Sequence, residues 1–199
     1  MKKKLFVSML AVSLALGLAA VRLFSAEGTA DPKEEVKTFE FKGSKQCITC
    51  HKELDDSVEV WQKQKHANAF ATLATDAAKE FSDDPQKDPK CLSCHTTGYG
   101  KTGGFALDLD DKKKENLVNV TCESCHGAGE EYNKLMMKAK MGGTFDGDAG
   151  KAAGLVIPTE EVCLTCHNDQ SPTFNAEEKF NFEEMSAKIK HGKKLEKKD

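Results

Sequence analysis

The stretch Cys47-Ile-Thr-Cys50-His51 decides how this chain folds, because its pattern occurs four times and the four runs hold all eight cysteines. Two thiols three positions apart, followed directly by an imidazole, form the attachment signature of c-type haem. In that chemistry the thiols form thioethers to the haem, and the histidine becomes the fifth ligand of the iron. The sequence therefore predicts four covalent haems, at Cys47 to His51, Cys91-Leu-Ser-Cys94-His95, Cys122-Glu-Ser-Cys125-His126 and Cys163-Leu-Thr-Cys166-His167.

Pairs of the Cys-x-x-Cys type also occur in zinc sites and in redox dithiols. A zinc ribbon does not require a histidine directly after each pair, and a thioredoxin-like dithiol occurs once, beside a βαβ pattern. Here all four pairs are followed by histidine, in a chain that holds only six histidines. The pattern therefore favours haem attachment over zinc binding or dithiol chemistry.

The first 30 residues have the pattern of an export signal, which agrees with covalent haem attachment outside the cytoplasmic membrane. Three lysines at positions 2–4 precede a mainly apolar stretch at positions 5–21, and small residues follow it. We expect cleavage near Ala26 or Ala30 and a periplasmic location. The alternative is an uncleaved membrane anchor, because an apolar stretch of this length lies at the lower edge of what spans a bilayer. No cysteine lies near the end of the signal, which excludes a lipoprotein.

Residues 31–199 are expected to form one tetrahaem domain that is mainly α-helical and rich in loops. The chain is 31% charged and 7% aromatic, so it has little apolar material for a conventional core. We therefore expect the four haems to form the core. Apolar periodicity predicts helices over residues 54–81, 130–141 and 182–189, and a glycine-rich turn over residues 99–104, with a short hairpin reaching residue 107.

Counting histidines shows that the four haems cannot all be equivalent. Four of the six histidines belong to the motifs, which leaves His66 and His191 as candidate sixth ligands. Two haems can therefore have two histidine ligands from this chain. For the other two, the sequence leaves open methionine, lysine, tyrosine, water, or a histidine of another subunit. Met136 and Met137, in the helix expected after the third motif, are the preferred candidates, and a thioether ligand would raise the reduction potential of its haem.

Several longer stretches resemble the tetrahaem cytochrome c554 family of ammonia-oxidising bacteria, whose type member takes electrons from hydroxylamine oxidoreductase. The resemblance covers nearly all of the chain after the signal. It includes Trp61 with Lys65-His66-Ala67, and Phe182 with Lys190-His191. The most specific stretches are Cys94-His-Thr-Thr-Gly98-Tyr-Gly100-Lys and Cys122-Glu-Ser-Cys-His-Gly-Ala-Gly129.

The resemblance implies which ligands belong together. It pairs His66 with His167 on the fourth haem and His191 with His126 on the third, and it leaves the second haem, at His95, five-coordinate. In the family the first haem, here at His51, takes a histidine from the segment after the third motif. That segment, residues 130–137, has no histidine in this chain, and Met136 or Met137 is the expected substitute.

The expected function is electron transfer between periplasmic redox proteins through four haems, and we expect a carrier rather than an enzyme. One alternative is a small haem enzyme that reduces nitric oxide or nitrite at the five-coordinate haem. A second is a subunit of an extracellular cytochrome polymer. The net charge is −3 and falls to −6 without residues 1–30, which argues against a nucleic-acid partner and favours a partner with a basic docking face. Membrane contact is expected only if the signal stays uncleaved, and the sequence leaves the oligomeric state undetermined.

Overall fold

The computed structural model describes residues 37–175, 177 and 180–194, and these belong to one compact unit. The expected signal and its cleavage sites lie outside the described residues. The described part is helical, with two isolated β-bridges and no strand, so the predicted mainly α, loop-rich class is confirmed. No helix among the described residues has the length and apolar character needed to cross a bilayer.

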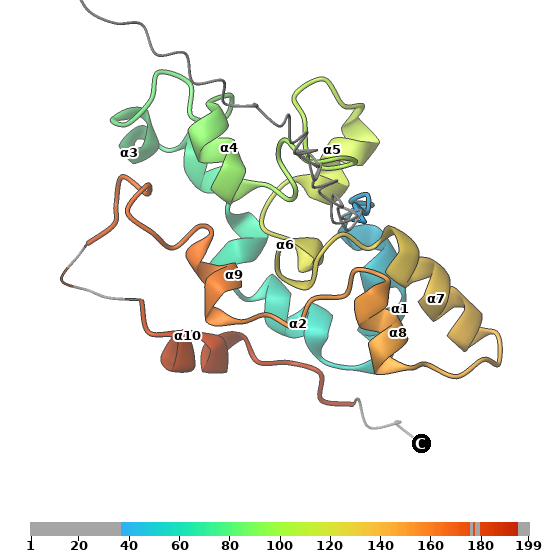
Figure 1. Ribbon diagram of the computed structural model, residues 1–199. Helices are drawn as coiled ribbons and strands as arrows, with labels where there is room; N and C mark the ends of the chain where they lie inside the picture. Colours follow the sequence, from blue (N-terminus) through green and yellow to red (C-terminus); the bar gives the residue numbers. More distant parts are fainter. Residues whose placement is uncertain (1–36, 176, 178–179, 195–199) are drawn as a thin grey trace, which may run out of the picture. The chain divides into compact units, whose positions relative to one another are not determined.

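Most helices are short (Figure 1). In chain order they are α1 (Ser44–Leu54), α2 (Ser57–Gln62), the 3-10 helices η1 (Lys65–Asn68) and η2 (Ala71–Ala74), α3 (Asp76–Lys79), α4 (Pro89–His95), α5 (Asp111–Leu117), α6 (Cys122–His126), α7 (Glu130–Lys140), α8 (Gly147–Ala152), α9 (Glu160–Leu164) and α10 (Phe182–Ile189).

Each haem motif begins within a helix. The first three lie entirely within α1, α4 and α6, and the fourth begins in α9 and ends just after it. Residues three apart lie on the same face of a helix, so each helix presents its two thiols in one direction. Helix α4 shows how such a short helix starts, since Pro89 occupies its first turn and the side chain of Asp88 accepts a hydrogen bond from the backbone N–H of Lys90.

The single helix predicted over residues 54–81 is wrong. The chain forms α2, η1, η2 and α3 there, and Gln64 is extended between α2 and η1. Backbone and side-chain groups of this segment form hydrogen bonds with residues 119–120 instead. The indole of Trp61 donates to the carbonyl of Val120 at 3.0 Å, the Val120 N–H donates to the carbonyl of His66, and the Phe70 N–H donates to the Asn119 side chain. These contacts outweigh the local helical preference.

The two other predicted helices and the predicted glycine-rich turn are present in the structure. The helices predicted over 130–141 and 182–189 are confirmed as α7 and α10. The glycine-rich stretch at 99–104 is a turn, as predicted, but no hairpin strands follow it, although the Phe105 N–H donates to the carbonyl of Thr97 at 2.9 Å. Gly103 has a φ of 74°, and a Cβ there would lie 2.5 Å from the Phe41 carbonyl oxygen, so the chain passes too closely for any other residue.

The buried apolar cluster is small. Within the described residues its fully buried members are Leu73, Leu92, Phe105 and Leu117, with partly buried side chains such as Phe41 and Phe70 around them. It lies beside the second motif, because Leu92 belongs to α4 and half-buried Cys91 contacts the cluster. The other three motifs therefore depend on different contacts for their positions.

Glu123, inside the third motif, makes one such set of contacts. Its side chain is buried, and its carboxylate accepts hydrogen bonds from the backbone N–H groups of Lys42, Gly43 and Gly129 at 2.6–3.1 Å. A buried carboxylate needs such donors, because burial of an unpaired charge is costly. Glu123 thereby joins the segment before α1 and the turn before α7 to α6.

Candidate haem centres

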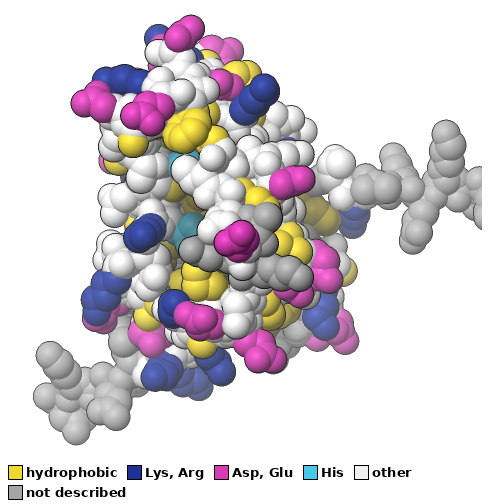
Figure 2. All heavy atoms as spheres, turned by 90° about the vertical axis from the view of Figure 1, so that its left-hand side faces the viewer, with side chains coloured by type: hydrophobic (Ala, Val, Ile, Leu, Met, Phe, Trp, Pro, Cys, Tyr) yellow, Lys and Arg dark blue, Asp and Glu magenta, His cyan; other side chains and the backbone are white. Residues whose placement is uncertain are grey.

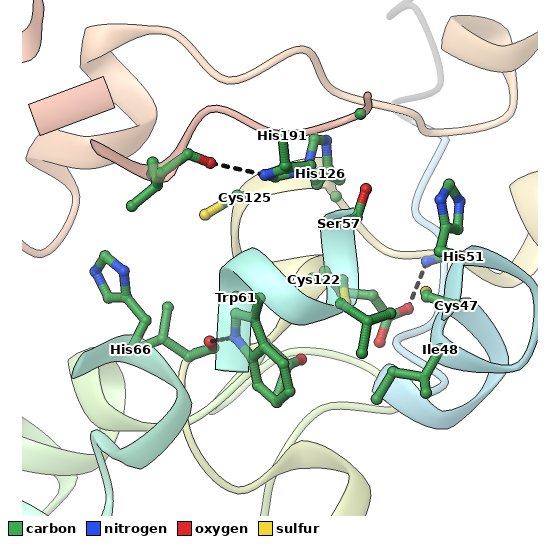
Figure 3. A pocket seen from close by; sticks show the side chains of 18 of the residues that line it. Cys47, Ile48, His51, Ser57, Trp61, His66, Cys122, Cys125, His126 and His191 are labelled. Atoms are coloured by element: carbon green, nitrogen blue, oxygen red, sulfur yellow. Dashed lines mark hydrogen bonds between the residues drawn. The ribbon is translucent and has the colours of Figure 1, made fainter. Parts of the chain in front are cut away.

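Residues of the first and third motifs line a common cavity of about 370 Å³ (Figure 3). It holds His51 and Cys47 on one side and Cys122, Cys125 and His126 on another. Four of the six histidines border it. The rest of its lining comes mainly from apolar and aromatic side chains together with the two non-motif histidines: Ile48, Val58, Trp61, His66, Val120, Tyr132, Leu155, Ile157, Ile189 and His191.

Two pairs of histidines face each other, and each pair joins a motif histidine to a non-motif one. The ring centroids of His66 and His167 are 6.0 Å apart, and those of His126 and His191 are 5.9 Å apart. Figure 3 shows His126 and His191 side by side. With a metal–nitrogen bond of about 2 Å, two imidazoles on opposite sides of one metal have ring centroids roughly 6 Å apart. Both pairs therefore have the spacing of two axial ligands.

Burial favours the neutral form of three of these four rings, His66, His126 and His167, and the neutral form is the one that binds iron. Burial lowers the pKa of His66, and the neighbouring His167 lowers it further. Burial also lowers the pKa of His126 and of His167. A neutral imidazole has a free ring nitrogen for a metal, whereas an imidazolium has none.

In three motif histidines, Nδ1 donates a hydrogen bond to an oxygen of the protein. His51 donates to the Asp55 carboxylate at 2.8 Å, His95 to the Ala69 carbonyl at 2.6 Å, and His126 to the Val156 carbonyl at 3.2 Å. Donation from Nδ1 fixes the tautomer in which Nε2 is free to bind a metal, and it also sets the ring orientation. His167 is oriented differently, since its ring stacks on Phe180 with centroids 4.9 Å apart.

The motif thiols bring the four motifs together. None forms a disulfide, but Cys47 lies next to Cys122, and Cys94 lies next to Cys166. The neighbouring Cys166 lowers the pKa of the free Cys94 thiol to about 6, and Cys94 in turn raises the pKa of Cys166. Burial raises the pKa of Cys125 to about 11, with a further contribution from the nearby Cys163. In space the motifs therefore follow one another in the order first, third, fourth, second.

A second cavity, of about 350 Å³, lies at the fourth motif and is bordered by α10. Cys166 and His167 line it together with Phe174, Phe180 and Met185. Figure 2 shows the side of the molecule that lies at the left in Figure 1, where histidine side chains are visible among hydrophobic ones. Both cavities thus combine motif cysteines and imidazoles with apolar side chains, although polar and charged residues such as Asn168, Glu184 and Lys188 also line the second cavity. The larger cavity, with its mainly apolar and aromatic lining, suits a large, flat, mostly apolar group such as a porphyrin.

Comparisons with known proteins agree with this chemistry. Residues 46–127 match the family model described as cytochrome c554 and c-prime. The chain is 28% identical over 209 residues to cytochrome c-554 of Nitrosomonas europaea, an alignment that covers 90% of this chain and 84% of that protein. The reduced-state structure of cytochrome c554 from Nitrosomonas europaea superposes with a TM-score of 0.60 at 28% identity, covering 75% of this chain and 82% of that one.

The chain is a c-type cytochrome that resembles cytochrome c554. It is a haem-based electron-transfer protein and carries four c-type haems, as its motif count predicts. The cysteine pairs, the lowered pKa values of His66, His126 and His167, and the 6.0 and 5.9 Å spacings between histidine rings fit such groups.

The predicted site residues of this cytochrome are only partly gathered in one place. His51, His66, His126 and His191 border the larger cavity, and His167 borders the second one. His95 lies apart, next to Ala69 and Thr72, whose hydroxyl is 3.2 Å from its Nδ1. Met136 and Met137 line neither of these two cavities.

Four residues of the sites were given no role at a haem from the sequence. Asp55 contacts His51, Glu123 holds the third motif, and Trp61 and Tyr132 line the larger cavity. Asp55 had a local signal, because it lies four residues after His51 and thus one helical turn away. The roles of Glu123 and Tyr132 depend on partners far away in the sequence, which no local pattern indicates.

Proposed function

We propose that this cytochrome is a periplasmic electron carrier that passes electrons between a donor and an acceptor redox protein through its four haems. The cysteines of each motif form the thioethers, and His51, His95, His126 and His167 are the proximal ligands. His66 is the sixth ligand opposite His167, and His191 is the sixth ligand opposite His126. The bound groups supply reversible one-electron chemistry at iron.

The contact between thiols of different motifs carries this proposal. Cys47 lies next to Cys122, and Cys94 lies next to Cys166, so attachment points of the first and third motifs are neighbours, and so are those of the second and fourth. Cys163 is close enough to raise the pKa of Cys125, which connects the two pairs. An unbroken series of neighbouring sites is what a carrier requires, whereas an enzyme requires one site with placed acid and base groups.

The polypeptide fixes the orientation of the histidine rings and sets the polarity and charge around the haems. Hydrogen bonds from Nδ1 to protein oxygens fix the rings of His51, His95 and His126. Stacking on Phe180 fixes the ring of His167. The larger cavity is lined mainly by apolar and aromatic side chains, which lowers the reorganisation of the surroundings that a change of charge at iron demands. The acidic net charge, which is −3 for the full chain and −6 without residues 1–30, favours redox partners with a basic face.

The proposal can be tested on the purified, exported protein. We expect a mass that corresponds to four haems and a chain cleaved near Ala26 or Ala30. Low-temperature electron paramagnetic resonance of the oxidised protein should show two low-spin species with two histidine ligands. Rapid mixing with a small reductant and then with a basic acceptor cytochrome should reduce and reoxidise all four haems.

Three results would contradict the proposal. The first is fewer than four haems in the folded protein, and the second is retention of residues 1–30 in a cytoplasmic form. The third is repeated turnover of nitric oxide or nitrite by the reduced protein at rates typical of enzymes, which would favour the alternative of a small haem reductase.

A further inference from the structure

Tyr132, rather than Met136 or Met137, lies at the haem site of His51. Its side chain lines the larger cavity together with His51, Cys47 and Ile48. We propose that the phenol oxygen of Tyr132 is the sixth ligand of the iron bound by His51. This inference rests on the proposed function, because it takes His51 as a proximal ligand.

The first turn of α7 is fixed against the first motif. The Asn133 side chain donates to the Gln46 side chain at 2.7 Å, so the neighbours of Tyr132 and of Cys47 are joined directly. The Glu130 N–H donates to the Glu40 carbonyl, and the Glu40 N–H donates to the Glu130 carboxylate. These bonds hold the backbone on both sides of Tyr132 next to α1.

The ring of Tyr132 is held as well. It packs edge to face against Phe145, with centroids 6.2 Å apart and an interplanar angle of 87°. Cys47 lies close enough to raise the pKa of Tyr132, although burial has the larger effect. The side chain is therefore confined between Phe145 and the attachment site of the first haem.

The two methionines are less well placed. Met136 lies one turn further along α7, about 6 Å along the helix axis from Tyr132, and does not line the cavity. Met137 follows it and is 53% exposed. The expectation that a methionine replaces the missing histidine is therefore not the one that the geometry favours.

Oxygen ligation by tyrosine is an established form of haem binding, as in catalase. When the oxygen–iron bond forms, the hydroxyl proton leaves to solvent and the oxidation state of the iron does not change. An anionic oxygen stabilises ferric over ferrous iron, so the haem of His51 should have a lower reduction potential than the two haems with paired histidines. A thioether ligand would have the opposite effect.

The test uses oxidised protein with its haems attached and compares Tyr132→Phe, Tyr132→His, Tyr99→Phe and a double Met136→Leu, Met137→Leu variant. The wild type should show a phenolate-to-iron charge-transfer band, with iron–phenolate modes in its resonance Raman spectrum. Tyr132→Phe should lose both signals. Tyr99→Phe, which changes the other tyrosine, and the methionine variant should keep them. Tyr132→His should show a third low-spin species with two histidine ligands.

Absence of phenolate signals from the wild type, or their persistence in Tyr132→Phe, would overturn the proposal. Loss of a near-infrared sulfur-to-iron band in the methionine variant would also overturn it, in favour of Met136 or Met137. Haem content measured by mass separates the two proposals. Fewer than four haems in the wild type contradicts the proposed function, whereas four haems without phenolate signals contradicts only the assignment of Tyr132.

Discussion

Asp55 and Glu123 are acidic residues whose side chains contact the haem motifs, Asp55 just after the first motif and Glu123 within the third. Asp55 begins the extended backbone that ends α1, and its carboxylate bonds to His51 and to the backbone N–H of Ser57. Glu123 accepts hydrogen bonds from three backbone N–H groups, two in the segment before α1 and one in the turn before α7. Each acts on a motif through one side chain, so single substitutions can test them.

Replacement of Asp55 by Asn should raise the reduction potential of the haem bound by His51. The carboxylate strengthens electron donation from the imidazole and so favours ferric iron, and a neutral amide does this less. Spectroscopic redox titration of the holoprotein should show one of four potentials moving up. Asp148→Asn is the control, because the Asp148 side chain is 91% exposed and pairs only with Lys151. An unchanged or lowered potential would show that the His51–Asp55 bond has no such effect.

Replacement of Glu123 by Ala should lower the free energy of unfolding by about 3 kcal/mol, because it leaves buried N–H groups without an acceptor. Urea unfolding of the holoprotein, followed by circular dichroism, gives this value. Glu183→Ala removes an exposed carboxylate from α10 and should change stability by less than about 0.5 kcal/mol. Equal effects of the two substitutions would show that the Glu123 bonds do not hold the fold.

At the scale of elements, hydrogen bonds join the junction between α1 and α2 to the segment after α10, and these bonds position His191. The Asp56 side chain accepts hydrogen bonds from the N–H groups of Gly192 and Lys193 at 2.7 and 2.9 Å. The Asp56 N–H donates to the Lys193 carbonyl at 3.0 Å, and Asp55 forms an isolated bridge with Lys194. The junction between α1 and α2 thus follows the helix that carries His51, and it also anchors the segment that brings His191 to His126.

Replacement of Asp56 by Ala should release this segment and weaken ligation by His191. We expect the low-spin signal of the His126 haem to decrease and a high-spin signal to appear, while the protein still carries four haems. The control is Asp76→Ala, since the Asp76 side chain is 99% exposed. A spectrum identical to that of the wild type would mean that ligation by His191 does not depend on Asp56.

The helices differ in how well the sequence could predict them. Helices α7 and α10 were predicted well because each is one regular helix. The segment 54–81 has similar periodicity, yet it breaks where Trp61 and Phe70 bond to residues 119–120, and such long-range bonds leave no local pattern. The motif residues were predicted from spacing alone. Tyr132 could not be chosen over Met136 in this way, because both lie on one face of α7 and only the fold places one of them at the cavity.

At the scale of the whole molecule, the protein chain alone has little apolar material to hold its fold. Four fully buried apolar side chains among the described residues, each stabilising by about 1.5–3 kcal/mol, offset only a small part of the conformational entropy lost on ordering a chain of this length. The motifs meet instead at thiols and imidazoles, where haems held as proposed would join segments from α1 to α10. Attachment and folding should therefore be linked.

A variant with all eight motif cysteines replaced by Ala should accordingly fail to fold. We expect circular dichroism typical of a largely disordered chain and no cooperative thermal transition, whereas the haem-bearing protein should melt cooperatively. A variant with only Cys91 and Cys94 replaced is informative, because the buried cluster lies beside that motif and provides contacts of its own. It should retain more helix than one with Cys122 and Cys125 replaced, because the third motif contacts both the first and the fourth. A cooperative melt of the eight-cysteine variant would show that the polypeptide, and not the haems, holds the fold together.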